Sequence, residues 1–210
     1  MLESTHFLLF LAAAAIIALT PGPGIFYVAA RALAGGRGEG LGSSLGTGIG
    51  GLLQVAAGAL GVSALVLASA GAFTLLKFAG ALYLVYLGIK TWRSAEAPLQ
   101  DFRLSPMRWP RALRAGVLVE ALNPKTAAFF LAFIPQFIDP ARGSAALQFA
   151  ALGLVSVALN TAVDLLVVVF ASSFRERLLR RPQLVRRLRR GAGSLICALG
   201  ISLALTRQPG

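Results

Sequence analysis

The chain has 210 residues, of which 57% are hydrophobic and 13% are charged, and its formal net charge is +12. A soluble domain is on average about 45–50% apolar and about 25% charged. The composition therefore excludes a soluble globule and a disordered chain, and the single cysteine, Cys197, excludes a disulfide scaffold. A membrane span needs about 20 residues, so we expect a multi-pass helical membrane protein.

Six apolar runs follow one another, and we interpret each as one transmembrane helix. They cover about Thr5–Ala30, Gly42–Ala68, Phe73–Ile89, Ala112–Ile138, Ala145–Phe170 and Ala192–Leu205. The residues before the first run include Glu3 but no Lys or Arg, which argues for a first span and against a signal peptide. The longest polar stretch, residues 94–110, separates the third run from the fourth.

Two of these runs are interrupted by proline at corresponding places. Pro21 breaks the first run and Pro124 breaks the fourth, and Gly50 and Gly153 correspond with the same offset. Because each half holds an odd number of spans, the halves have opposite orientations. The sequence thus predicts an all-α membrane protein of six helices, arranged as two inverted three-helix repeats with helices one and four broken. The repeats cover residues 1–93 and 111–210, and residues 94–110 form a cytoplasmic linker.

The basic residues are distributed unevenly between the loops. Sixteen of the 20 Lys and Arg residues fall in the three odd-numbered loops, three fall on the other side, and Lys125 lies inside the fourth run. The longest tract, Arg175–Arg190, lies between two apolar runs, which favours a cytoplasmic loop over a nucleic-acid surface. This asymmetry predicts that both termini lie outside the cytoplasm.

The two breaks and the fifth run supply the candidate site residues. The segment from Thr20 to Gly24 and the segment from Asn123 to Lys125 would each start a half-helix inside the membrane, whose free N–H groups attract an anion. Charged or polar groups inside spans are costly and therefore functional candidates. The candidates for substrate binding are Thr20, Pro21, Gly22, Pro23, Gly24, Gln54, Asn123, Pro124, Lys125, Asn160 and Asp164. The candidates for proton coupling are Asp164 and Glu120, because burial favours a protonated carboxyl.

Structural explanations compete with these functional ones. The proline breaks could be simple kinks, Glu120 and Lys125 could neutralise each other as an ion pair, and Asp164 could make a packing hydrogen bond. Glycines recur at intervals of four from Gly38 to Gly58, interrupted by Gln54. Such a stripe favours close helix packing, within one chain or between copies of a homo-oligomer.

The motifs in this order resemble the LysE/RhtB family of amino-acid exporters. The resemblance rests on the segment from Thr20 to Pro23, the glycine series, Gly80–Leu84 with Gly88, Asn123–Lys125 and Pro135–Phe137. It implies a secondary transporter in the bacterial inner membrane that exports amino acids or related small metabolites, with proton coupling. It implies no enzymatic activity, no cofactor and no nucleic-acid partner.

Other membrane functions fit the residues less well. A thiol–disulfide carrier needs two intramembrane cysteines, and a metal transporter is expected to show His or Cys clusters, whereas the chain has one residue of each type. The segment from Gly42 to Leu45 lacks the last glycine of a serine-protease motif, and Asp164 has no second intramembrane aspartate. A transporter or channel for a non-amino-acid solute remains the alternative.

Overall fold

The computed structural model describes residues 4–67 and 107–173 continuously, together with isolated helical positions between residues 75 and 93 and between residues 183 and 205. Its main helices are α1 (Ser4–Leu19), α2 (Pro23–Leu67), α4 (Trp109–Ala121), α5 (Pro124–Ala128) and α6 (Ala145–Ser173). A π-helical turn, η3 (Phe129–Phe133), and a 3-10 turn, η4 (Ile134–Phe137), continue α5, and a second 3-10 turn, η5, covers Pro140–Arg142. The described residues contain no strand, so the expectation of an all-helical protein is confirmed for this part of the chain.

Three of the described helical segments are long and apolar enough to cross a membrane. They are Pro23–Gly61, Trp109–Phe137 and Ala145–Ser173, and His6–Leu19 is a shorter apolar helix. Most of the third and sixth predicted spans, residues 94–106 of the linker and the basic tract up to residue 182 lie outside the described residues. The six-span arrangement therefore stays a prediction.

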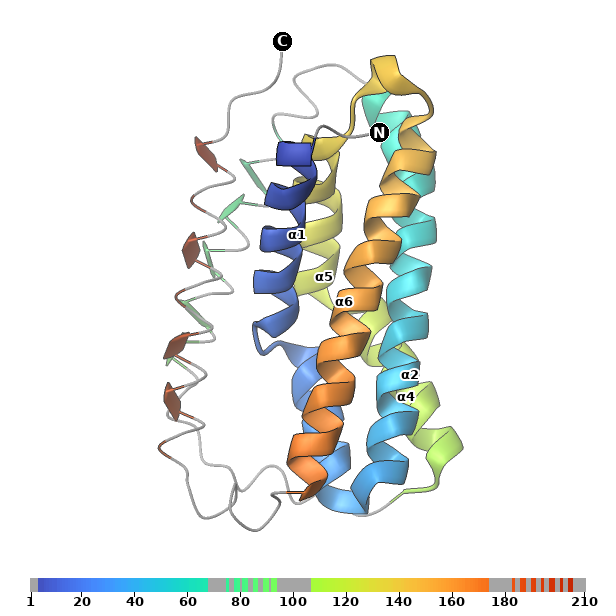
Figure 1. Ribbon diagram of the computed structural model, residues 1–210, viewed down its shortest axis with the longest axis vertical. Helices are drawn as coiled ribbons and strands as arrows, with labels where there is room; N and C mark the ends of the chain where they lie inside the picture. The colour runs from blue at the N-terminus through green and yellow to red at the C-terminus, as the bar shows by residue number, and fades with distance from the viewer. Residues whose placement is uncertain are drawn as a thin grey trace.

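Helix α2 is a helical hairpin with its turn at Gly36. This residue has φ 73° and ψ −159°, a conformation that is essentially restricted to glycine. Residues 23–35 descend to one end of the bundle and residues 37–67 return along its length (Figure 1). The prediction of a loop between residues 31 and 41 was wrong in its extent, because one glycine reverses the chain. Arg31 and Glu39 form a buried ion pair of 3.3 Å beside this turn.

The two predicted breaks are present. Helix α1 stops at Leu19 and α2 starts at Pro23, because Pro21 and Pro23 lack the N–H groups that a continuous helix needs. Helix α4 stops at Ala121, and Asn123 caps α5 by accepting a hydrogen bond of 3.0 Å from the backbone N–H of Lys125. Figure 1 shows that the two broken helices run in opposite directions and change element near the middle of the bundle.

Glycines let α2 lie close to two neighbouring helices. A Cβ at Gly46 would collide with the backbone carbonyl of Leu113 in α4, and one at Gly50 would lie 2.6 Å from the carbonyl of Val117. A Cβ at Gly58 would instead meet Phe149 of α6. The glycine stripe therefore serves helix packing within the chain, at least at these positions.

The aromatic core fills the half of the bundle that contains α1, η3 and η4. Phe129 stacks on Phe133 with ring centroids 5.1 Å apart, and Phe10 of α1 meets Phe137 edge to face at 5.5 Å. Phe129 and Phe130 are only 1% exposed. These phenylalanines thus pack α1 and α6 around the second half of the broken helix.

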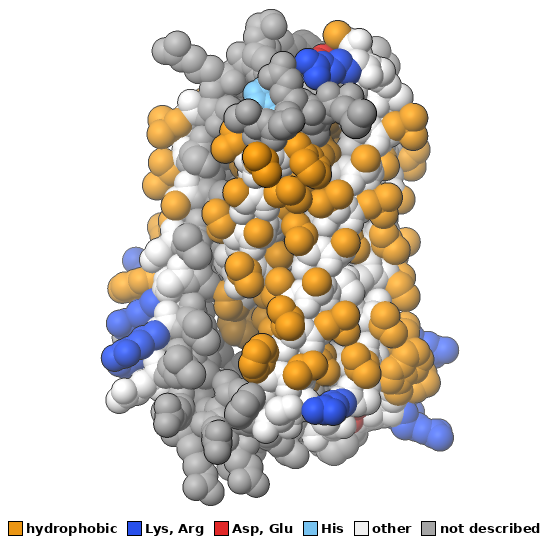
Figure 2. All heavy atoms as spheres, viewed as in Figure 1, with side chains coloured by type: hydrophobic (Ala, Val, Ile, Leu, Met, Phe, Trp, Pro, Cys, Tyr) orange, Lys and Arg blue, Asp and Glu red, His pale blue; other side chains and the backbone are white. Residues whose placement is uncertain are grey.

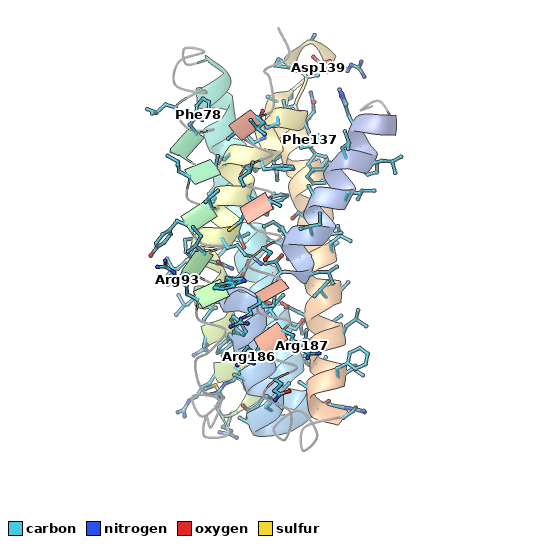
Figure 3. All side chains as sticks on the ribbon, turned by 90° about the vertical axis from the view of Figure 1, so that its left-hand side faces the viewer. Phe78, Arg93, Phe137, Asp139, Arg186 and Arg187 are labelled. Carbon is cyan, nitrogen blue, oxygen red and sulfur yellow. The ribbon has the colours of Figure 1, made fainter. Side chains whose placement is uncertain are left out.

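Apolar side chains cover the long sides of the bundle, and cations gather toward one end. Figure 2 shows a broad hydrophobic surface, with most visible Lys and Arg side chains in the lower part. Arg186 and Arg187 lie toward this end, whereas Phe78 and Asp139 lie toward the other (Figure 3). Asp139 pairs with Arg142 at 2.8 Å.

Candidate functional site

The two helix breaks contact each other through Lys125. Its ammonium group donates hydrogen bonds to the backbone carbonyls of Ile17, at 3.0 Å, and Thr20, at 2.9 Å. The two carbonyls lie at the end of α1 and just after it, where helix hydrogen bonding leaves oxygens under-satisfied; that of Ile17 also accepts from the backbone N–H of Thr20 at 3.3 Å. Gly22 makes room for the lysine chain, since a Cβ there would lie 3.0 Å from Lys125 Cδ. A cation from the second break therefore caps the first.

Glu120 is held at the end of α4 by residues of its own break. Its Oε2 accepts from Asn123 Nδ2 at 2.8 Å and its Oε1 accepts from Thr126 Oγ1 at 2.6 Å. The carboxylate packs on Gly24, where a Cβ would lie 2.5 Å from Oε2. Glu120 is 7% exposed. The break thus buries a carboxylate against the first turn of α2.

These positions match the electrostatics of the helix ends. The N-terminus of a helix carries a partial positive charge and the C-terminus a partial negative charge. Glu120 lies at the first turn of α2, and Lys125 lies at the last carbonyls of α1. Each break thereby supplies the charge that stabilises the other break. None of the ion pairs among the described residues joins Glu120 to Lys125 directly.

Gln54 contacts the carbonyl groups at the C-terminal end of α4. Its Nε2 lies 2.7 Å from the carbonyl of Glu120, 3.2 Å from that of Ala121 and 3.3 Å from that of Asn123. Gln54 therefore supports the C-terminus of α4 through backbone groups. Gln54 does not belong to the residues that line the cavity described below.

Helix α6 contributes Asp164 from the opposite side. Asp164 is 4% exposed, and its Oδ2 lies 2.7 Å from Thr47 Oγ1 on α2. Thr47 Oγ1 also lies 2.8 Å from the carbonyl oxygen of Ser44, one turn earlier. A single hydroxyl hydrogen thus faces two oxygens. Asp164 belongs to no ion pair among the described residues.

A small cavity lies where the breaks, α2 and α6 meet. Its volume of about 20 Å³ has room for about one water molecule but none for an amino acid. Polar side chains from four elements surround it, and small or apolar residues complete its wall. Its lining residues are Gly24, Ile25, Thr47, Gly48, Gly51, Glu120, Asn123, Lys125, Thr126, Val157, Asn160, Thr161 and Asp164. The site is therefore too small to hold an amino acid in this structure.

The structure brings only part of the predicted set to this cavity. Gly24, Glu120, Asn123, Lys125, Asn160 and Asp164 line it. Thr20, Pro21, Gly22, Pro23 and Pro124 form the breaks beside it without lining it. The hydroxyl of Thr20 donates back to the carbonyl of Ile16 at 2.6 Å, while its own carbonyl binds Lys125.

Sequence reasoning did not find the three threonines of the cavity. Thr47, Thr126 and Thr161 are common residue types in apolar helices, and no spacing rule distinguishes them. Thr126 follows the break directly and Thr161 follows Asn160, so proximity to a polar residue was the available signal. The described residues contain no group of three His, Cys, Asp or Glu side chains that could hold a metal ion.

Comparison with known proteins places this geometry in context. A family model described as LysE type translocator matches residues 15–207. An uncharacterized membrane protein of Vibrio cholerae is 35% identical over 95% of this chain and 97% of its own. A homoserine/homoserine lactone efflux protein of Salmonella typhi is 30% identical over 95% and 96%. A leucine efflux protein of Klebsiella pneumoniae is 29% identical over 64% of each chain. No solved structure matches.

Proposed function

Because the chain belongs to the LysE family of translocators, we propose that it is a proton-coupled secondary transporter that exports amino acids or closely related small metabolites from the cytoplasm. It acts as a transporter and not as an enzyme. Relatives that cover nearly its whole length or about two thirds of it are named efflux proteins for homoserine, homoserine lactone or leucine. The observation that carries the proposal is a small polar cavity between two broken, oppositely directed helices, which is a typical transporter site.

The proposed architecture is six spans in two inverted repeats, residues 1–93 and 111–210, joined by residues 94–110. Helix α2 ends at one end of the bundle and α4 begins at the other (Figure 1). The labelled Phe78 lies toward the end at which α2 finishes, and Arg93 lies nearer the middle of the bundle (Figure 3); this fits one crossing between α2 and α4. One crossing there gives three spans in the first half.

The proposed location is the bacterial inner membrane, with both termini outside the cytoplasm. The first turns of α4, with exposed Arg108, Arg111 and Arg114, and the turn of α2 lie at the lower end of Figure 1. Helix α1 begins at the upper end. Positively charged loops stay in the cytoplasm, so the lower end faces the cytoplasm.

In the proposed site the substrate is held as a zwitterion. Its carboxylate binds at the half-helix starts after Pro23 and Pro124, near Asn123 and Lys125, where the lysine ammonium uses two of its three hydrogens on α1. Its amino group binds near Asp164 and Asn160 of α6, across the cavity from Lys125, and also reaches Glu120, which lies beside Asn123. Opposite charges on two walls suit a ligand that carries both charges.

The small size of the cavity implies that transport requires the helices around the breaks to move apart. Alternating access in inverted-repeat transporters comes from rocking of one half against the other. Here Lys125 on α5 donates a hydrogen bond to the carbonyl of Thr20 just after the end of α1, and Glu120 on α4 packs on the start of α2. Substrate groups that replace these contacts would compensate the charges exposed when the halves separate.

Transport by purified protein in proteoliposomes tests the function. Vesicles loaded with homoserine or leucine should exchange radiolabelled amino acid, and an imposed pH gradient should drive net accumulation. Asp164→Asn and Lys125→Ala should reduce net transport about tenfold or more, whereas Arg114→Gln at the exposed start of α4 should not. Wild-type rates in both site variants would reject the assigned site. Transport of amino acid without any effect of the pH gradient would reject proton coupling and favour a channel.

A further inference from the structure

We propose that Asp164 is the residue that carries the coupling proton, with the hydroxyl of Thr47 as its hydrogen-bond switch, and that Glu120 stays ionised throughout. This assignment rests on the proposed proton-coupled transport. Both acids line the same cavity and both are buried. Their hydrogen-bond partners differ, and that difference decides which acid gains and loses the proton.

Each oxygen of Glu120 already receives a hydrogen. The orientation of the Asn123 amide is set, because its Oδ1 accepts from the backbone N–H of Lys125, so its Nδ2 must face Glu120 Oε2. An amide nitrogen can only donate. Thr126 Oγ1 has no other hydrogen-bond acceptor within the described residues, so it donates to Oε1. Two donated bonds and the first turn of α2 stabilise the ionised carboxylate.

Asp164 has a different environment, because its one partner can either donate or accept. Thr47 Oγ1 lies 2.7 Å from Asp164 Oδ2 and 2.8 Å from the Ser44 carbonyl oxygen, which can only accept. With Asp164 protonated, its O–H donates to Thr47 and Thr47 donates to Ser44, so both short contacts are hydrogen bonds. With Asp164 ionised, the Thr47 hydrogen rotates to the carboxylate. Thr47 therefore stabilises both forms.

The charges that face Asp164 come from two other elements. Glu120 of α4 and Lys125 of α5 line the same cavity, and no charged residue of α1 or α2 does so. The Lys125 ammonium is bound to the end of α1. No dedicated cation therefore compensates an ionised Asp164 in the closed site. A neutral Asp164 fits this small cavity without a counter-charge, whereas an ionised one is stabilised by the Thr47 hydroxyl together with water or a cationic ligand.

The coupling proton and the substrate ammonium group compete for the same carboxylate oxygen, Asp164 Oδ2, and this competition produces antiport. A proton from the outside binds Asp164 Oδ2, the closed protein reorients, and the proton leaves to the cytoplasm. The exposed carboxylate then binds the ammonium group of a cytoplasmic amino acid, which leaves outside when the next proton arrives. The cavity of about 20 Å³ must widen to hold the amino acid. The proton and the amino acid therefore cross the membrane in separate steps.

Difference infrared spectroscopy of the purified full-length protein locates the proton without any transport. The wild type and Glu120→Gln should show the carbonyl band of a buried protonated carboxyl group that disappears at alkaline pH, and Asp164→Asn should lack it. Thr47→Val should shift this band, because the carboxyl group loses its partner. Ser156 lies on the same helix as Asp164, and its buried hydroxyl has no hydrogen-bond partner among the described residues. Ser156→Ala should therefore leave the band unchanged. Loss of the band in Glu120→Gln but not in Asp164→Asn would overturn the assignment.

Vesicle transport separates this assignment from the general function. Asp164→Asn should lose about tenfold or more of the homoserine or leucine accumulation driven by a pH gradient, and its exchange at equal pH should fall as well, because the same carboxylate binds the substrate ammonium group. If Asp164→Asn still accumulates substrate in response to the gradient, Asp164 is not the carrier, although the transport function stands. If the wild type transports neither amino acid, the proposed function fails, while the infrared band still tests Asp164. Thr47→Val retains Asp164 and covers the case in which Asp164→Asn does not fold.

Discussion

The hydrogen bonds from Lys125 to the end of α1 predict that loss of the Lys125 ammonium group lowers the free energy of unfolding. Lys125→Met keeps a long unbranched side chain and removes the ammonium group. Lys125 is 4% exposed, and its ammonium is hydrogen-bonded to the carbonyls of Ile17 and Thr20. Without it, the carbonyl of Thr20 has no hydrogen-bond donor from any described residue.

The expected magnitude follows from two opposing effects. A hydrogen bond to a charged group contributes about 1.5–3 kcal/mol, so two such bonds contribute about 3–6 kcal/mol. Removal of a buried cation relieves part of its desolvation cost, which offsets some of that loss. We expect the free energy of unfolding to fall by about 2–4 kcal/mol. For a chain of this size that lowers Tm by about 5–15 °C.

Thermal unfolding of the purified protein in detergent measures this shift. Arg114→Met is the matched control, because it removes an exposed cation on α4 with no ion-pair partner among the described residues. It should change Tm by no more than about 1–2 °C. The reasoning is refuted if Lys125→Met unfolds at the same temperature as Arg114→Met, since the α1 carbonyls would then need no cation.

Four further single substitutions and one double variant test the packing and the turn of α2. Gly46→Ala forces a methyl group onto a backbone carbonyl of α4, so it should lower the free energy of unfolding by about 1–3 kcal/mol. Gly38→Ala has open space around it and should raise the free energy of unfolding by about 0.5–1 kcal/mol. Equal Tm values for these two variants would contradict the packing of α2 against α4 within the chain. Gly36→Ala should cost about 1–3 kcal/mol, because its φ of 73° strains any side chain, and an unchanged denaturation midpoint would argue against the tight turn. Glu39→Gln removes the carboxylate charge that pairs with the buried Arg31 at 3.3 Å and should cost about 3–5 kcal/mol. The double variant with Arg31→Met should lose less than the sum of the two single variants, and simple additivity would show that the pair is not coupled.

The sequence by itself determined the class of the protein and the location of its breaks. Apolar composition with little charge leaves only a membrane environment, and backbone polar groups in lipid require helices. Pro21, Pro23 and the Asn123–Pro124 pair end and start helices for reasons that lie within a few residues, so local chemistry was enough. The glycine at residue 36 was not distinguished from its neighbours, because its positive φ depends on where α2 meets the rest of the bundle.

Only the tertiary structure decided the partners of the buried charges. Lys125 lies five residues from Glu120 in the chain, yet its ammonium binds carbonyls of α1, more than one hundred residues away. Thr47 and Asp164 are likewise brought together from α2 and α6. Such pairings depend on how close two helices approach, which small residues such as Gly22 and Gly24 permit. The sequence therefore identified the charges inside the membrane, and the packing of the helices determined what each of them contacts.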